Sequence, residues 1–254
     1  LTPVDTAAPC LYAEKSVFVG NNDNITSKIG SNGPIQVQMG AKVTGDIVST
    51  GKTLYQNWQK PVALYNNSIV TGAVTTGYPS IYKDPTAAIG GVTTTNFAKK
   101  FPALVPKTVT IGSANIYPPT NGTTYTLVPG RYNNLAANPG AILMLTTGTY
   151  EFNEFQATGT KILLDVSNGP IAIKVKSFLN LSTGTTTTAI NGSFVDLNSR
   201  EISWYSNGRL GLGNNTLLKG QFLAPFNQDW DQLGTNVTLI GSLKASTINV
   251  STGA

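Results

Sequence analysis

A short element in which apolar residues flank a glycine recurs along this chain. It occurs as VTGDIVS at Val43–Ser49, and related versions follow at Ile69–Thr75, Ile190–Asp196, Leu218–Ala224 and Leu239–Ala245. Gly45 and Gly72 are 27 residues apart, and Gly220 and Gly241 are 21 apart. Recurrence at about 20 to 30 residues is typical of a solenoid, in which each turn buries its apolar side against its neighbours.

The pattern around these elements predicts short β-strands. Apolar and polar residues alternate in Ile35–Met39, Ile171–Val175 and Ile248–Val250. Alternation with a period of two indicates half-buried strands. We therefore predict an all-β fold, a right-handed parallel β-helix that forms a single solenoid domain over residues 1–254. A β-sandwich is the alternative, because it also has short strands and glycine-rich turns.

Within each element the glycine is predicted to form a corner, because only glycine readily adopts a positive φ and permits close packing of successive coils. Apolar residues on either side would then point inward and stack on equivalent residues of the next coil. The predicted core includes Val43, Ile47, Ile69, Val74, Ile190, Phe194, Phe222 and Leu243.

One segment, residues 79–106, departs from the strand pattern and is predicted to be an insertion with a short helix. Asp84 is a favourable N-cap, and Pro85 suits the first position of a helix. A second stretch with helical spacing runs from Thr95 to Phe101.

The composition excludes several kinds of chemistry. Charged residues make up 11% of the chain, against about a quarter in typical domains, and His is absent. A catalytic triad that uses His and a zinc site made of His or Cys are therefore excluded. Cys10 is the only cysteine, so no intrachain disulfide forms. The basic residues behind the net charge of +5 are scattered, which does not favour a nucleic-acid partner.

Two carboxylate pairs are candidates for catalytic groups. Asp229 and Asp231 are two residues apart, Glu151 and Glu154 are three apart, and neither pair is expected to have an Arg or His nearby. We therefore expect no enzyme, no catalytic residue, no cofactor and no metal requirement. Carboxylates and carbonyl oxygens around Asp229 remain compatible with Ca²⁺.

Two aromatic clusters are candidates for binding carbohydrate, because exposed rings stack on sugars while neighbouring amides and carboxylates make hydrogen bonds. The first interrupts the regular pattern at 225–232 and should project as a loop on a rigid scaffold. Its members are Phe226, Asn227, Asp229, Trp230 and Asp231, and the second cluster consists of Tyr55, Trp58 and Tyr65. The alternative is that these rings fold back and cover the solenoid.

Self-assembly is a further possibility, because the open ends of a solenoid have unpaired backbone groups. The strand that contains Ile248 and Val250 is predicted to pair with the segment Val17, Phe18 and Val19 of a neighbouring subunit. The alternative is that a longer natural chain covers this edge.

The residues from Ile202 to the end resemble bacterial secreted β-solenoid domains of the ice-binding and surface-adhesin type, with an aromatic strand followed by recurring glycine strands. Leu127–Tyr132 is similar to the Leu-x-Pro-Gly-x-Tyr turn of that group, with a looser match at Leu145–Tyr150. The chain departs from the ice-binding pattern in its opening segment and in its reduced helix around 84–101. A vaguer likeness is to cellulose-binding surface proteins of the tapirin type.

The resemblance implies a non-enzymatic extracellular protein, a rigid solenoid on the cell surface or in a fibre, with itself or an insoluble polysaccharide as partner. An ice-binding protein and a carbohydrate-binding module of a polysaccharide-degrading system are the alternatives. Ice binding needs regular Thr arrays, whereas in Gly184–Thr188 the threonines are consecutive, so half of them must point away from a shared face.

The sequence is compatible with export. Leu1–Val4 lacks the pattern of a signal peptide, and no apolar run approaches the roughly 18 residues that a membrane-spanning helix needs, so we expect a mature extracellular chain without membrane insertion. Asn-x-Ser/Thr sequons, which are acceptors for N-glycosylation, begin at Asn24, Asn66, Asn121, Asn180, Asn191, Asn214, Asn236 and Asn249.

Overall fold

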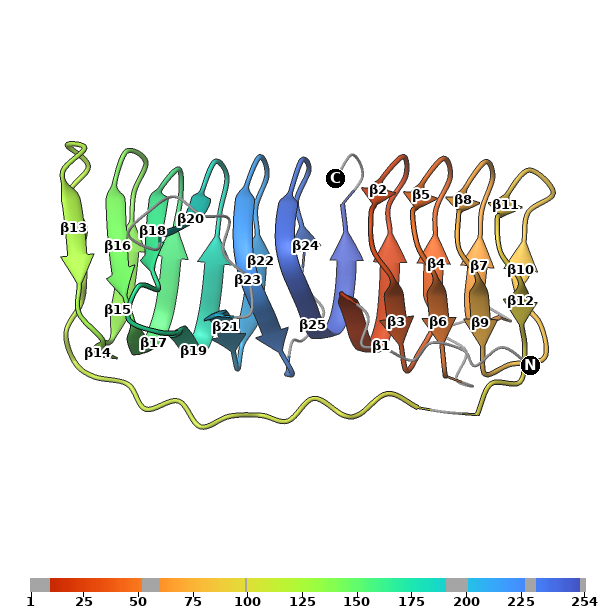
Figure 1. Cartoon of the computed structure of the whole chain (residues 1–254), viewed down its shortest axis with the longest axis horizontal. Helices are drawn as coiled ribbons and strands as arrows, with labels where there is room; N and C mark the ends of the chain where they lie inside the picture. The colour runs from red at the N-terminus through yellow and green to blue at the C-terminus, as the bar shows by residue number, and fades with distance from the viewer. Residues whose placement is uncertain (1–9, 52–59, 99, 191–200, 227–231, 252–254) are drawn as a thin grey trace. The chain divides into compact units, whose positions relative to one another are not determined.

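The computed structural model describes residues 10–51, 60–98, 100–190, 201–226 and 232–251, and the protein is all-β (Figure 1). Every strand pairing with a defined register is parallel. Parallel pairing between successive passes of the chain is a property of stacked coils, whereas sandwiches are built from antiparallel sheets. The described strands therefore fit the solenoid prediction and not the sandwich alternative.

The contacts within the chain divide it into two compact units. The prediction that residues 1–254 form a single domain stays a prediction. Unit 1 comprises residues 1–104 and 246–254, and unit 2 comprises residues 105–245. The strands of unit 1 are β1 (Leu11–Val19), β2 (Asn24–Ile25), β3 (Ile29–Ser31), β4 (Ile35–Val37), β5 (Lys42–Val43), β6 (Ile47–Ser49), β7 (Val62–Leu64), β8 (Ile69–Val70), β9 (Val74–Thr76), β10 (Tyr82–Lys83), β11 (Ala88–Ile89) and β12 (Thr93–Thr94).

Unit 2 follows in the chain, and most of its strands are longer than those of unit 1. They are β13 (Thr124–Leu127), β14 (Gly130–Arg131), β15 (Asn134–Ala137), β16 (Ile142–Thr146), β17 (Gly148–Ala157), β18 (Lys161–Asp165), β19 (Ile171–Leu181), β20 (Thr186–Ile190), β21 (Ile202–Ser206), β22 (Arg209–Leu212), β23 (Leu217–Ala224) and β24 (Gln232–Leu233). The last strand, β25 (Thr238–Val250), contributes residues to both units.

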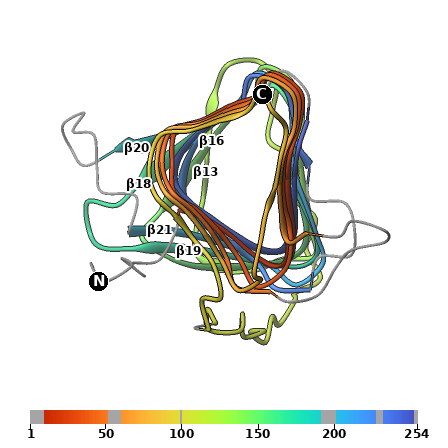
Figure 2. The ribbon, with the colours of Figure 1, turned by 90° about the vertical axis from the view of Figure 1, so that its right-hand side faces the viewer.

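Unit 1 is a stack of coils whose strands align in three columns. One column contains β2, β5, β8 and β11, the second β3, β6, β9 and β12, and the third β4, β7 and β10. Seen along the stack in Figure 2, the successive coils of this unit superpose. Identical or similar apolar residues meet in register, as with Ile29, Ile47 and Val74, which are all fully buried.

The predicted core is mostly confirmed, but Ile69 and Ile190 face outward instead of inward. Val43, Ile47, Val74, Phe222 and Leu243 are buried, and Phe194 lies outside the described residues. Ile69, however, is 42% exposed, because Val43 aligns with Val70 and the outward Lys42 aligns with Ile69. A one-residue shift moves a side chain to the opposite face of a strand.

The second of these two errors occurs in unit 2. Ile190, predicted to be in the core, is half-buried, while the neighbouring Ala189 is buried and aligns with Leu164 of β18. Ile190 therefore takes the outward position at the end of β20.

Unit 2 is also a stack of coils with inward residues in register, and several of these residues have larger side chains than those of unit 1. Its inward positions align from coil to coil, and one row consists of Tyr150, Ile173, Trp204, Phe222 and Leu243, all of them buried. The rings of Trp204 and Phe222 are stacked with centroids 5.6 Å apart and an interplanar angle of 2°. Three of the five residues in this row are aromatic, and we call it the aromatic row.

Corners in unit 2 use residues with a positive φ, namely Gly122, Gly140, Gly159, Gly184, Asn215 and Asn236. Glycine adopts this conformation without strain, and asparagine tolerates it better than other residues. In unit 1 the corner predicted at Gly45 is confirmed, with a φ of +153° and only 2.6 Å between the Ser27 carbonyl oxygen and the position that a Cβ would occupy.

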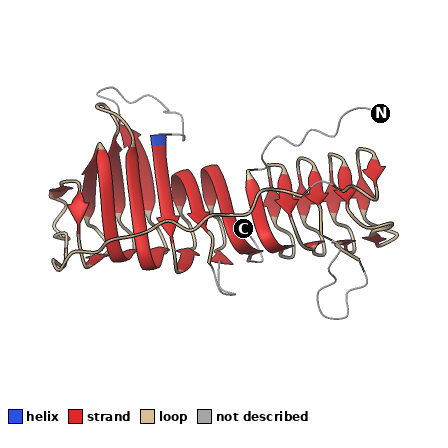
Figure 3. Ribbon diagram, turned by 90° about the horizontal axis from the view of Figure 1, so that it is seen from below, coloured by secondary structure: helices blue, strands red, loops and turns tan. Residues whose placement is uncertain are grey.

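The predicted helix in 79–106 is wrong. The described part of this segment contains β10, β11 and β12, and the Asp84 carboxylate accepts hydrogen bonds from the Thr86 backbone N–H at 3.0 Å and the Thr86 hydroxyl at 2.7 Å. These contacts form a local turn that competes with helix formation. Among the described residues only Glu201 is helical, as a 3₁₀ residue directly before β21 (Figure 3).

Residues 95–123, which we call the connector, join β12 to β13 as an extended loop. In unit 1 the Asn32 side chain holds the connector by two hydrogen bonds to Phe101, donating to its carbonyl at 3.1 Å and accepting from its N–H at 3.0 Å. The Tyr12 hydroxyl donates to the Pro102 carbonyl at 3.2 Å, and the Tyr12 and Phe101 rings lie 5.2 Å apart. The connector therefore covers Tyr12, which is 4% exposed.

The covered phenol makes unit 1 sensitive to alkali. Burial, and secondarily the charge of Glu14, raise the pKa of Tyr12 to about 12, although a hydrogen bond from Asn32 opposes this shift. A pKa that is higher in the folded than in the unfolded protein contributes stability below pH 10, and this stability is lost as the pH rises from about 10 to about 12. We expect Tyr12→Phe to reduce the loss of unfolding free energy over this pH range, measured by urea denaturation. An unchanged pH dependence in the variant would contradict this expectation.

Candidate functional site

Most of the carbohydrate-binding residues predicted from the sequence lie outside the described residues. These are Tyr55, Trp58, Asn227, Asp229, Trp230 and Asp231. Phe226 is described, lies two residues after the end of β23 and is 54% exposed. Tyr65, after β7 in unit 1, is half-buried with its ring 5.5 Å from that of Tyr82, and burial raises its pKa. Phe226 and Tyr65 belong to different units.

The strands predicted to join neighbouring subunits instead meet within one chain. β1 pairs with β25, and the Gly20 N–H donates to the Val250 carbonyl at 3.2 Å. Val17, Val19, Ile248 and Val250 are buried, while Phe18 is 37% exposed. The edge of β1 that was assigned to another subunit is therefore occupied by β25 of the same chain, because the C-terminal part of β25 belongs to unit 1.

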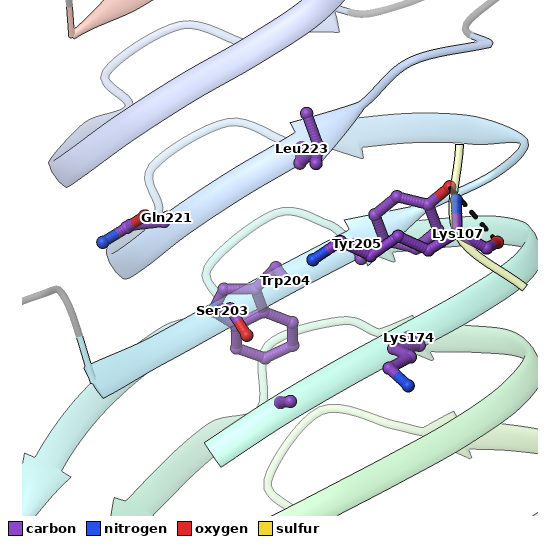
Figure 4. A pocket seen from close by; sticks show the side chains of 8 residues that line it. Lys107, Lys174, Ser203, Trp204, Tyr205, Gln221 and Leu223 are labelled. Carbon is purple, nitrogen blue, oxygen red and sulfur yellow. Dashed lines mark hydrogen bonds between the residues drawn. The ribbon is translucent and has the colours of Figure 1, made fainter. Parts of the chain in front are cut away.

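A pocket of about 120 Å³ lies on the outer surface of unit 2, on strands β19, β21 and β23 (Figure 4). The inward residues of these strands form the aromatic row of the core, so their neighbours along each strand point outward. Ala172, Ser203 and Gln221 align in one outward row. Because the side chains of Ala172 and Ser203 are short, the surface has a depression at this point. We call this hollow the β19–β23 pocket.

The second outward row beside the pocket contains Lys174, Tyr205 and Leu223, which align with one another. Tyr205 is buried because the connector lies over it: the Lys107 N–H donates to the phenol oxygen, and the Asn207 amide donates to the Lys107 carbonyl at 2.9 Å. Figure 4 shows Lys107 directly beside Tyr205. The connector thus completes the pocket from outside the sheet.

Burial under the connector raises the pKa of the Tyr205 phenol, although the hydrogen bond from the backbone of Lys107 partly opposes this effect. Tyr205 is therefore neutral at ordinary pH. The Lys107 ammonium lies 5.7 Å from the centre of the Tyr205 ring, a geometry in which the π face attracts a cation.

Three charged side chains align on adjacent strands next to the pocket. Glu151 accepts from the Arg131 guanidinium at 3.1 Å and from the Lys174 ammonium at 3.4 Å. The Glu151 side chain is 11% exposed, against 30% for Lys174 and 63% for Arg131. The expectation that Glu151 has no arginine nearby was wrong, because parallel stacking brings Arg131 from the preceding coil into register with it.

The other carboxylate of that predicted pair, Glu154, lies beyond a register shift in β17 and accepts a hydrogen bond from the Gln156 amide at 2.8 Å. Glu151 and Glu154 thus have separate partners. Within the described residues no group of three or more His, Cys, Asp or Glu side chains is placed to hold a metal ion. The same residues include no helix long and apolar enough to cross a membrane.

Sequence reasoning missed the β19–β23 pocket entirely. Lys107 and Lys174 were not singled out, because the charges are far apart in the chain and no local motif links them. The available signal was the alternation in Ile171–Val175, which predicts that Ala172 and Lys174 point outward.

Comparison with known proteins finds no relative of this chain. No family model matches the chain, and no match was found among the curated proteins or among the solved structures. The class of protein is therefore defined by the fold alone, as an all-β protein of stacked parallel coils.

Proposed function

We propose that the protein is a non-enzymatic extracellular scaffold that adheres to polysaccharide. The observation that carries this proposal is the regular register of unit 2, in which the inward row from Tyr150 to Leu243 continues without a break from coil to coil. A core of this kind holds the outward rows at fixed spacings of about 4.8 Å, which suits contact with a repeating polymer. We further propose that the coils close into a right-handed β-helix, as the resemblance to secreted solenoids implies.

The outward surface of unit 2 supports a role in binding sugar. Thr149, Ala172, Ser203, Gln221 and Ser242 align in one row, and four of these five side chains carry hydroxyl or amide groups. Such groups make hydrogen bonds to sugar hydroxyls. The exposed ring of Phe226 follows the strand that carries Gln221, which places an apolar surface close in the chain to this polar row.

The proposal is tested by pull-down of the intact protein on insoluble and immobilised polysaccharides, including cellulose, mannan and polygalacturonate. We expect retention on at least one of them and a severalfold loss of retention for Trp230→Ala, the aromatic residue that the sequence favours as a platform. Failure of the intact protein to bind any polysaccharide would end the adhesion proposal.

Ice binding is the alternative function, but the threonines on another face of unit 2 do not form the regular array that it needs. Within Thr185–Thr188, Thr186 and Thr188 are half-buried outward residues, while Thr185 and Thr187 are fully buried. Thr186 aligns with Lys161 and Leu217 on adjacent strands, so the row is not uniformly threonine. Thermal hysteresis of the purified protein distinguishes this candidate from adhesion.

A further inference from the structure

The surroundings of the β19–β23 pocket carry more positive than negative charge. Lys107 and Lys174 both line the pocket, and Lys244 lies one coil further along the row that contains Leu223. The carboxylate of Glu151 is shared between Arg131 and Lys174. Since Arg131 alone balances that carboxylate, Lys174 adds a net positive charge to the pocket.

The ammonium group of Lys107 is not needed to hold the connector in place. The connector is bound here through the backbone N–H and carbonyl of Lys107, which contact Tyr205 and Asn207. The Lys107 side chain is exposed and forms no ion pair in the part of the chain that the structure describes. This leaves the Lys107 charge available to a ligand.

The pocket has the dimensions and donors of a site for one acidic group. A volume of about 120 Å³ is well above the roughly 10–15 Å³ that one water molecule needs, so the pocket has room for a carboxylate and the adjoining ring atoms. Ser203 and Gln221 add a hydroxyl and an amide to the two ammonium groups. Charge-assisted hydrogen bonds from ammonium to carboxylate are about twice as strong as neutral ones.

We propose that the β19–β23 pocket binds the carboxylate of a uronic acid in an acidic polysaccharide, with Lys107 and Lys174 as its charged ligands. The proposal rests on the proposed adhesive function and specifies the class of polysaccharide. A uronate fits better than a neutral sugar, because a neutral ligand would leave the positive charge of this region uncompensated: Arg131 and Lys174 share the single carboxylate of Glu151, and Lys107 forms no ion pair among the described residues. The outward polar row through Ser203 and Gln221 would contact the hydroxyl groups of the same polymer.

The test compares binding of the intact protein and three variants to polygalacturonate, in low and high salt, by microscale thermophoresis. Lys107→Gln and Lys174→Gln each remove one charge at the pocket. Lys161→Gln is the matched control, because Lys161 is an exposed lysine of unit 2 on β18 and does not line the pocket. All three substitutions preserve backbone contacts, and in Lys174→Gln the Glu151 carboxylate keeps its pairing with Arg131.

We expect Lys107→Gln and Lys174→Gln each to weaken binding about tenfold, which corresponds to about 1.4 kcal/mol, while Lys161→Gln changes it less than twofold. We also expect binding to weaken as salt is raised, because salt screens exposed charges. Equal losses in all three variants, or equally tight binding of duplex DNA, would show general attraction to polyanions and overturn the proposal. Binding of dextran sulfate with the same lysine dependence, but not of polygalacturonate, would overturn the assignment to a carboxylate.

The same series separates failure of this inference from failure of the adhesive function. Binding to cellulose or mannan that is unaffected by Lys107→Gln and Lys174→Gln, with no binding to polygalacturonate, refutes the uronate site and leaves adhesion standing. An absence of binding to every polysaccharide refutes both.

Discussion

Trp204→Ala is expected to destabilise unit 2 by about 3 to 5 kcal/mol, the usual cost of deleting a large buried aromatic side chain. Trp204 is 1% exposed, is stacked on Phe222, and makes a T-shaped contact with Phe155 at a centroid distance of 5.7 Å. Its indole N–H donates to the Lys219 carbonyl at 3.0 Å. The substitution therefore leaves a cavity in the aromatic row and removes one hydrogen bond to the Lys219 carbonyl.

The measurement is urea denaturation followed by circular dichroism. Trp204→Phe is the control, because it keeps an aromatic ring in the row but lacks the indole N–H, and it should cost clearly less than the alanine variant. A loss of less than about 1 kcal/mol for Trp204→Ala would mean that the site collapses around the smaller residue, or that the row contributes little to stability.

Gly241→Ala is expected to cost at least about 3 kcal/mol or to prevent folding of unit 2, because steric overlap and backbone strain act together. Gly241 has a φ of +145°, and a Cβ at this position would lie 1.9 Å from the carbonyl oxygen of Gly220 on the adjacent coil. That neighbour is backbone, so it moves only if the two strands separate. The two glycines are aligned in β23 and β25.

Gly122→Ala provides the matched comparison for Gly241→Ala. Gly122 also has a positive φ, of +79°, but a Cβ there meets no atom within 4 Å. We expect this variant to lose only about 1 to 2 kcal/mol, the cost of the backbone conformation alone. Thermal unfolding of both variants measures the difference, and similar melting temperatures would contradict a steric role for the recurring glycine.

The recurring glycine element is the part of the fold that the sequence predicts best. Gly45 forms a corner, Gly220 and Gly241 are in register, and the inward residues Val43 and Ile47 are buried as expected. The sequence does not determine, for every copy of the glycine element, which residues point inward. At Ile69–Val70 two apolar residues are adjacent, so alternation alone does not reveal which of them points inward.

The candidate site was far less accessible to sequence reasoning, because its residues meet only through the coil register and the path of the connector. Arg131 reaches Glu151 from the preceding coil, and Lys107 reaches Tyr205 from a segment without periodicity. The helix prediction failed for a related reason. Asp84 and Pro85 suit a helix start, but the same aspartate also makes the local turn with Thr86 that the structure contains.

The pairing of β1 with β25 bears on how the protein is made. A ribosome synthesises β1 first, and the strand that completes its edge, residues 246–250, emerges only after all of unit 2. Until then the edge of β1 has free backbone groups that attract other chains. Contacts between residues so distant in sequence also slow folding. The path of the chain therefore leaves this edge of β1 without its β25 partner throughout the synthesis of unit 2.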